Sequence, residues 1–207
     1  MNKVDTDDIA AAPDWDRFDH PQRLFALAHP QRWPRVAPVS DGAALSCRSA
    51  NGNVLMEVLC FSRAAPKANH LVDAVVEGLV KFAAHEDGMS GGRVISVNQF
   101  DFGGAERCID VLVAFLDASG TEISVDYFVV GTSTTGLYVA LKTPTASYAE
   151  NLPDFERVLG TLRAPWLQAK SAPDLSAGGH RHTGTAGAQR RGLAPVLIVL
   201  ASWSGLT

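Results

Sequence analysis

The chain has 207 residues, of which 46% are hydrophobic, and its formal net charge at pH 7 is −4. This length can enclose one sizeable core, so we expect a single globular domain with extensions at its ends. The mild acidity argues against a nucleic-acid-binding surface and against a polybasic membrane surface.

The N-terminal stretch, residues 1–14, is acidic and polar, and we expect it to be a flexible arm. It lacks the basic start and the apolar run of a secretory signal, which favours a cytoplasmic protein. The three cysteines Cys47, Cys60 and Cys108 are too few and too scattered for a disulfide framework. We expect buried free thiols, with one bridge and a spare thiol as the alternative.

Ordered structure is expected to start near residues 15–18, and a short strand over residues 24–28 follows and ends at His29-Pro30. Trp33 follows, and because it precedes Pro34 its backbone should be extended. Its side chain should either fill one end of the core or form the lip of a pocket.

A hairpin and a helix come next. Strands over residues 43–49 and 54–62 flank Asn51-Gly52, a strong signal for a two-residue hairpin turn. The second strand is apolar on both parities, which predicts a sheet covered on both faces. Residues 69–85 carry apolar side chains at helical spacing, and Asn69 is a suitable N-cap.

The best-defined part of the sequence is a meander of four strands over residues 93–101, 107–117, 121–130 and 137–141. The link Ala118-Ser119-Gly120 suits a three-residue hairpin loop, with Gly120 at positive φ. This loop predicts the pairs Phe115–Ile123, Val113–Val125, Val111–Tyr127 and Ile109–Val129, whose side chains share a core face with Leu137, Val139 and Leu141.

The opposite face of the meander combines apolar and acidic side chains. Asp110, Phe128 and Tyr138 are expected to form a row across three strands. If it is exposed, this face is a candidate partner-binding surface, and otherwise the second helix covers it. The candidate partner-binding residues are Trp33, Asp110, Leu112, Asp126, Phe128 and Tyr138.

The second helix is expected over residues 152–163, with Asn151 as N-cap and Pro153 in its first turn. Residues 167–192 are expected to form a flexible linker, and residues 193–207 an apolar tail shorter than a membrane span. Together these elements predict one α+β domain over residues 15–166. It contains an antiparallel sheet of about six to seven strands with helices packed on it, in the order three strands, helix, four strands, helix.

Recognised catalytic motifs are missing from the sequence. It contains no Gly-x-Ser-x-Gly, His-Glu-x-x-His, Cys-x-x-Cys or phosphate-loop pattern. Asp110 and Asp126 lie diagonally on neighbouring strands, where they could do acid–base work or simply pair with basic groups. His180 and His182 lack a third ligand nearby. We therefore predict no catalytic, cofactor-binding or metal site.

The segment Phe25-Ala-Leu-Ala-His-Pro30-Gln-Arg-Trp33, with the order of elements after it, resembles the PsbP-like group of α/β/α sandwiches. This group includes the Ran-binding Mog proteins and the bacterial DcrB-like proteins. The resemblance implies a binding or accessory role, and some bacterial relatives are adaptors or chaperones for type VI secretion effectors. DcrB-like members are envelope lipoproteins, and this sequence lacks their signal and its cysteine.

Several functions remain open at this point. The leading hypothesis is a non-catalytic, cytoplasmic bacterial protein-binding module, an adaptor or chaperone, whose partner is another protein such as a secreted effector. A homodimer is an open alternative, and neither nucleic acid nor a membrane is expected as a partner. The alternatives are a small-molecule or lipid carrier, an enzyme using Asp110, Asp126 and a histidine, and a structural protein with its tail from Leu193 at a membrane.

Overall fold

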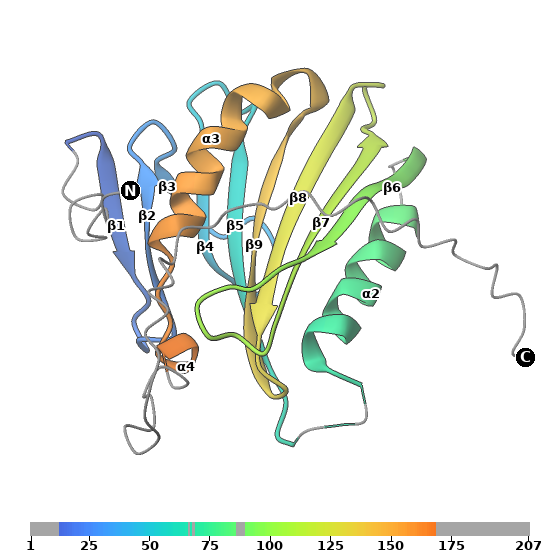
Figure 1. Ribbon diagram of the computed structural model, residues 1–207. Coiled ribbons are helices and arrows are strands. Elements are labelled where there is room, and N and C mark those ends of the chain that lie inside the picture. Colours follow the sequence, from blue (N-terminus) through green and yellow to red (C-terminus); the bar gives the residue numbers. More distant parts are fainter. Residues whose placement is uncertain (1–12, 66, 68, 86–89, 169–207) are drawn as a thin grey trace, which may run out of the picture.

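The computed structural model describes residues 13–65, 67, 69–85 and 90–168. Within them the fold is α+β, as expected, and antiparallel strands dominate it (Figure 1). The strands and helices in chain order are β1 (Trp15–Asp19), β2 (Ala26–Pro30), β3 (Arg35–Val36), β4 (Ala43–Arg48), β5 (Leu55–Ser62), α2 (Leu71–His85), β6 (Ser90–Gln99), β7 (Arg107–Leu116), β8 (Glu122–Gly131), β9 (Thr135–Pro144), α3 (Thr145–Thr161) and α4 (Pro165–Gln168).

Seven of the strands form one large antiparallel sheet in the order β3-β4-β5-β9-β8-β7-β6, and β1 pairs with β2 in a separate hairpin. In Figure 1, α3 and this hairpin lie on one side of the large sheet and α2 lies on the other. Alternating residues of β8 show the two layers, because Phe128 packs in the α3-side core and Val129 in the α2-side core. The sandwich predicted from the sequence is confirmed.

The register predicted for the β7–β8 hairpin is confirmed. Phe115 is opposite Ile123, and Ile109 is opposite Val129. Gly120 has a φ of 80°, the left-handed conformation that a three-residue hairpin loop requires at its last position. These apolar side chains face α2.

The predicted face of β9 was wrong by one residue. Gly131 is opposite Gly136, which places Val139 opposite Phe128 and Tyr138 opposite Val129. Leu137, Val139 and Leu141 therefore face α3, and Tyr138 faces α2. Because both faces of β9 are apolar, the hydrophobic pattern did not fix the register, and a slip of one residue exchanges the faces.

The helix α2 begins two residues after the expected Asn69, whereas α3 begins seven residues before the expected Leu152. Pro144 ends β9 and stands at the N-cap of α3, and Pro153 lies inside the helix. A proline at that position lacks the N–H of an intrahelical hydrogen bond. Nearby, the Asn151 side chain donates to the Ser147 carbonyl over 2.8 Å.

The first part of the chain contains two strands, β1 and β3, that the sequence did not predict, and β2 continues through His29 and Pro30. The backbone of β1 pairs with β2 from Trp15 opposite Pro30 to Asp19 opposite Ala26. Neither β1 nor β3 has a regular apolar alternation, which explains why the hydrophobic pattern of the sequence did not predict them.

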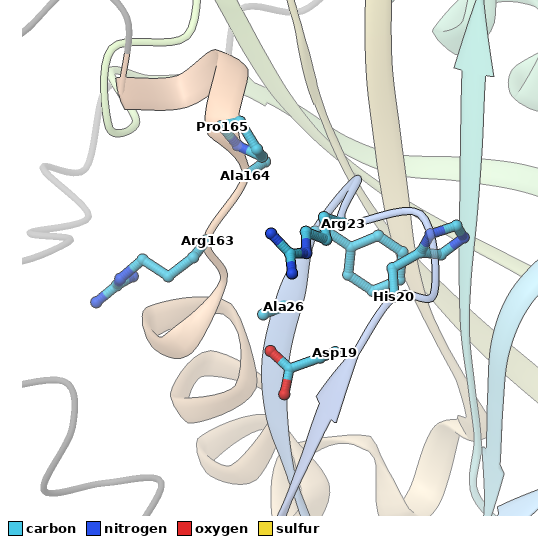
Figure 2. A pocket seen from close by; sticks show the side chains of 8 residues that line it. Asp19, His20, Arg23, Ala26, Arg163, Ala164 and Pro165 are labelled. Atoms are coloured by element: carbon cyan, nitrogen blue, oxygen red, sulfur yellow. The ribbon is translucent and has the colours of Figure 1, made fainter.

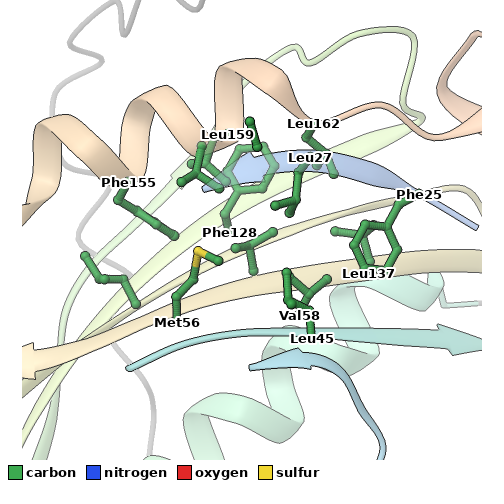
Figure 3. Close-up of a cluster of buried hydrophobic side chains, with 14 of the residues drawn as sticks. Phe25, Leu27, Leu45, Met56, Val58, Phe128, Leu137, Phe155, Leu159 and Leu162 are labelled. Atoms are coloured by element: carbon green, nitrogen blue, oxygen red, sulfur yellow. The ribbon is translucent and has the colours of Figure 1, made fainter. Parts of the chain in front are cut away.

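The larger core lies between the sheet and α3 (Figure 3). Phe155, Leu159 and Leu162 approach the sheet from the helical side, where Met56, Phe128 and Leu137 meet them. Met56 and Phe155 are fully buried. The space between these two layers is therefore filled by side chains.

Candidate functional site

Four of the six candidate partner-binding residues are buried. Trp33, Asp110, Asp126 and Phe128 are each at most 4% exposed. Trp33 packs in the α3-side core, which matches the core-filling role that the sequence left open. Phe128 is covered by the rings of Phe100 and Phe102, with centroids 5.6 and 4.9 Å away.

The predicted apolar–acidic surface is therefore corrected by the structure. Leu112 and Tyr138 keep partial exposure, but they lie on opposite faces of the sheet. The row across β7, β8 and β9 on the α3 side is Asp110, Phe128 and Val139. Burial of this face by the second helix, α3, was the alternative prediction. The loop with Phe100 and Phe102 covers the face together with α3.

The two acidic residues of this face lie inside the fold. Asp110 is opposite Phe128 and Asp126 is opposite Leu112, so the carboxylates are diagonal neighbours, as predicted. The Tyr148 hydroxyl of α3 donates a hydrogen bond of 2.5 Å to Asp126 Oδ2. This contact ties α3 to the centre of the sheet, and it was not visible in the sequence because the helix was expected to begin after Tyr148.

The cysteines are free thiols, as expected. Burial raises the pKa of Cys47 to about 12 and also raises the pKa of Cys108 and of Cys60. A thiol with a raised pKa holds little thiolate, the form that acts as nucleophile and metal ligand. The buried thiols of Cys47 and Cys108 are therefore poor nucleophiles.

No group of three or more metal-ligating side chains occurs among the described residues. His180 and His182 lie outside this part of the chain. So do residues 1–12 of the predicted arm over residues 1–14, residues 169–192 of the predicted linker over residues 167–192, and the predicted tail over residues 193–207. None of the helices in the described ranges combines the length and the apolar character needed to cross a bilayer.

A group of partly exposed apolar side chains lies on the α2 side, over β5 and β9. The helix α2 contacts chiefly β6, β7 and β8, because it carries the chain from β5 in the sheet interior to β6 at the edge. Beyond it, apolar side chains of β5 and β9 remain partly exposed. We call this group the β5–β9 patch, and it consists of Leu55, Leu59, Phe61 and Tyr138.

Backbone pairing holds the patch in a fixed arrangement. Leu59 is directly opposite Tyr138, and Phe61 is opposite Gly136. A Cβ atom at Gly136 would come within 2.5 Å of the Phe61 ring, so this glycine makes room for the aromatic side chain. The Tyr138 ring meets that of Tyr127 edge-on at 5.8 Å. The patch is thus a preformed surface with two aromatic rings.

A buried carboxylate lies beside the patch. Glu57 accepts hydrogen bonds from the Ser40 backbone N–H at 3.0 Å, the Ser40 hydroxyl at 2.6 Å and the Ser46 hydroxyl at 2.9 Å. These bonds hold the loop around Ser40 against the sheet. Burial raises the pKa of Tyr138 to about 12, and the negative charge of Glu57 adds to this effect.

The sequence predicted a binding role for Tyr138 but not for its neighbours in the patch. The alternation of Leu55, Leu59 and Phe61 with Met56 and Val58 was visible and predicted cover on both faces. Met56 and Val58 are fully covered, whereas the other three side chains are only partly covered. The apolar alternation of β5 was visible in the sequence. The position of α2 on the sheet, over β6 to β8, decides that the α2-side residues of β5 stay partly exposed.

Comparison with known proteins supports the fold and does not show a family. No protein-family model matches the chain, and no curated protein matches it significantly. A structural neighbour is the solution structure of cyanobacterial PsbP (CyanoP) from Synechocystis sp. PCC 6803, with 12% identity and a TM-score of 0.57 over 79% of this chain and 96% of that chain. The chain therefore has a PsbP-like fold at low sequence identity.

Two further structures complete the comparison. A Bacteroides thetaiotaomicron VPI-5482 protein aligns with 16% identity and a TM-score of 0.51 over 72% of this chain, which spans only 47% of that protein. LpqN of Mycobacterium tuberculosis, described as involved in cell envelope biogenesis, aligns over 79% of this chain and 99% of its own with 12% identity. Its TM-score of 0.49 is too low to support an argument about this chain.

Proposed function

We propose that this protein is a non-catalytic protein-binding module that uses the β5–β9 patch. The observation that carries the proposal is the group of partly exposed apolar side chains on the α2 side, where Leu59 and Tyr138 pair across two strands. Uncovered apolar groups that cluster on a rigid element mark interaction sites more often than isolated ones do. The PsbP-like fold is compatible with this role and does not by itself define it.

The finer proposal is a cytoplasmic adaptor or chaperone that holds an apolar segment of another protein, such as a secreted effector. Tyrosine and phenylalanine are enriched at protein interfaces because each buries a large area with few rotatable bonds. Tyr138 and Phe61 supply such rings beside the aliphatic Leu55 and Leu59. A partner segment with two or three large apolar side chains would match this surface.

The carrier alternative receives no support from the core. It requires a cavity between the sheet and a helix, whereas Met56 and Phe155 fill the layer between the sheet and α3. We therefore keep protein binding as the proposal.

Site-specific photo-cross-linking in the native cell tests this proposal. A benzophenone side chain placed at Tyr138 should form a discrete adduct, and Leu59→Asp should abolish it. The matched control is the same probe at Leu116, a large apolar residue that is 38% exposed at the end of β7. Mass spectrometry of the adduct identifies the partner, and a secreted effector would support the adaptor role.

An adduct at Leu116 but not at Tyr138 would reject the patch as the binding surface. An adduct that contains only a second copy of the chain would replace the adaptor role with a homodimer. Folding of Leu59→Asp is checked by circular dichroism, so that loss of the adduct is not mistaken for loss of structure.

A further inference from the structure

A pocket lies far from the β5–β9 patch in the sequence, between the β1–β2 hairpin and the link from α3 to α4 (Figure 2). Its volume of about 540 Å³ is within the roughly 300–1,000 Å³ of small-molecule sites. The hairpin contributes Asp19, Arg23 and Phe25, and the link contributes Arg163, Ala164 and Pro165.

The two walls are joined by the backbone. Ala26 and Arg163 exchange two hydrogen bonds of 2.8 Å, one in each direction. On the hairpin, His20 N–H donates to the Phe25 carbonyl at 3.0 Å, and Arg23 N–H donates to the His20 carbonyl at 2.7 Å. The backbone of both walls is therefore held in place by the fold.

Arg23 has an unusual conformation for its residue type. Its φ is 55°, and among the described residues every other positive φ belongs to a glycine. The left-handed region is unfavourable for a side chain such as arginine, and strain of this kind concentrates at functional sites. Figure 2 shows the Arg23 guanidinium directed into the gap between the hairpin and the link.

The charges around the pocket favour an anion. Asp19 is already neutralised by Arg17, whose Nε and Nη2 donate to its two oxygens at 3.0 Å each. Arg163 lies on the opposite wall, where its Nη1 donates to the Leu162 carbonyl at 2.7 Å. Figure 2 shows the Arg163 guanidinium directed away from the hairpin. With the Asp19 charge paired, Arg23 leaves positive charge at the pocket, although the whole chain carries −4.

The remaining lining is apolar. Phe25 is almost fully buried, and its ring packs against those of Phe18 at 5.5 Å and His20 at 5.3 Å. Ala164 and Pro165 add aliphatic surface on the other wall. A guanidinium next to an apolar wall fits an anionic group attached to a compact apolar body.

We propose that this pocket binds a small organic anion, with its carboxylate or phosphate on Arg23 and its apolar body against the apolar lining that Phe25 and the exposed Pro165 contribute. This site is separate from the protein-binding patch, so either proposal can fail without the other.

An NMR titration of the full chain tests the proposal. Benzoate and inorganic phosphate are added separately, and the amide shifts of Ala26, Arg163 and Ala164 are followed. We expect saturating shifts at these residues with benzoate, or with phosphate if the phosphate group alone is recognised. Arg23→Gly should weaken the binding roughly tenfold or more, the usual effect of losing a hydrogen bond to a charged group.

The Arg23→Gly variant is chosen because glycine adopts a φ of 55° without strain, so the hairpin should remain folded. Arg48→Gln is the matched control, since Arg48 is an exposed arginine on β4 away from the pocket. Its affinity should equal that of the unaltered chain. Shifts that do not saturate, or equal affinities in Arg23→Gly and Arg48→Gln, would overturn the proposal.

Discussion

The two faces of the large sheet have similar apolar content and different cover. On one face α3, the β1–β2 hairpin and the loop with Phe102 bury Met56, Val58 and Phe128. On the other face α2 covers β6 to β8 and leaves Leu59 and Tyr138 of the neighbouring strands partly exposed. Apolar alternation in a strand therefore indicates which residues could be buried, whereas the placement of the helices decides which of them are.

The largest expected effect separates the two faces by stability. Phe155→Ala empties a fully buried site between α3 and the sheet, which should lower the free energy of unfolding by about 3–5 kcal/mol. Leu59→Ala, in the patch, should lower it by only about 1 kcal/mol, because a partly exposed side chain loses less burial. Urea unfolding followed by circular dichroism measures both. Equal losses would show that the patch is part of a core.

A smaller effect tests how α3 is fixed to its face. Tyr148→Phe removes the hydroxyl that donates to Asp126, and we expect a loss of about 1–3 kcal/mol because the carboxylate is buried. Tyr138→Phe is the matched change on the other face, where no hydrogen bond is lost to a buried acid. The same urea experiment applies, and a loss in Tyr138→Phe as large as that in Tyr148→Phe would contradict this account.

The smallest expected effect is a pH dependence of the α3 side. His29 is fully buried on β2, its Nε2 has no hydrogen-bond partner among the described residues, and burial lowers its pKa below 6.5. As the pH falls, His29 therefore takes up a proton in the unfolded chain at a higher pH than in the folded chain. Stability from this group is complete above about pH 6.5 and decreases below it, by at most about 1.4 kcal/mol per pH unit.

His29→Leu isolates this contribution from the other histidines. The free energy of unfolding is measured at pH 7.5 and 5.5 in both proteins, and the difference between the two values should be smaller in the variant. An unchanged difference would assign the pH dependence to other groups.

The sequence was sufficient to predict the register of a hairpin where independent local signals agree. Gly120 and the apolar parity of β7 and β8 predicted their register correctly, since the loop length and the burial pattern agree. The register of β9 failed because Leu137 and Tyr138 are both suitable for a core. The start of α3 failed because Pro153 resembles a helix start and instead lies within the helix.

The candidate site was less predictable than the fold. Tyr138 was predicted to lie on the same face as Phe128, whereas it faces α2. Its neighbours in the patch come from β5, more than seventy residues earlier in the chain. Such proximity depends on the strand order, which places β9 between β5 and β8. No local pattern in β5 contains this information.

The pairing of β5 with β9 also has a consequence for folding of the protein during its synthesis on the ribosome. All eight residues of β5, from Leu55 to Ser62, pair with β9, whose last residue is Pro144. Until that strand has emerged, β3 to β5 form a short sheet with an unpaired edge, the kind of edge that recruits other chains. Emergence of β9, through Pro144, from the ribosome is therefore the step that joins both halves of the sheet and removes this aggregation hazard.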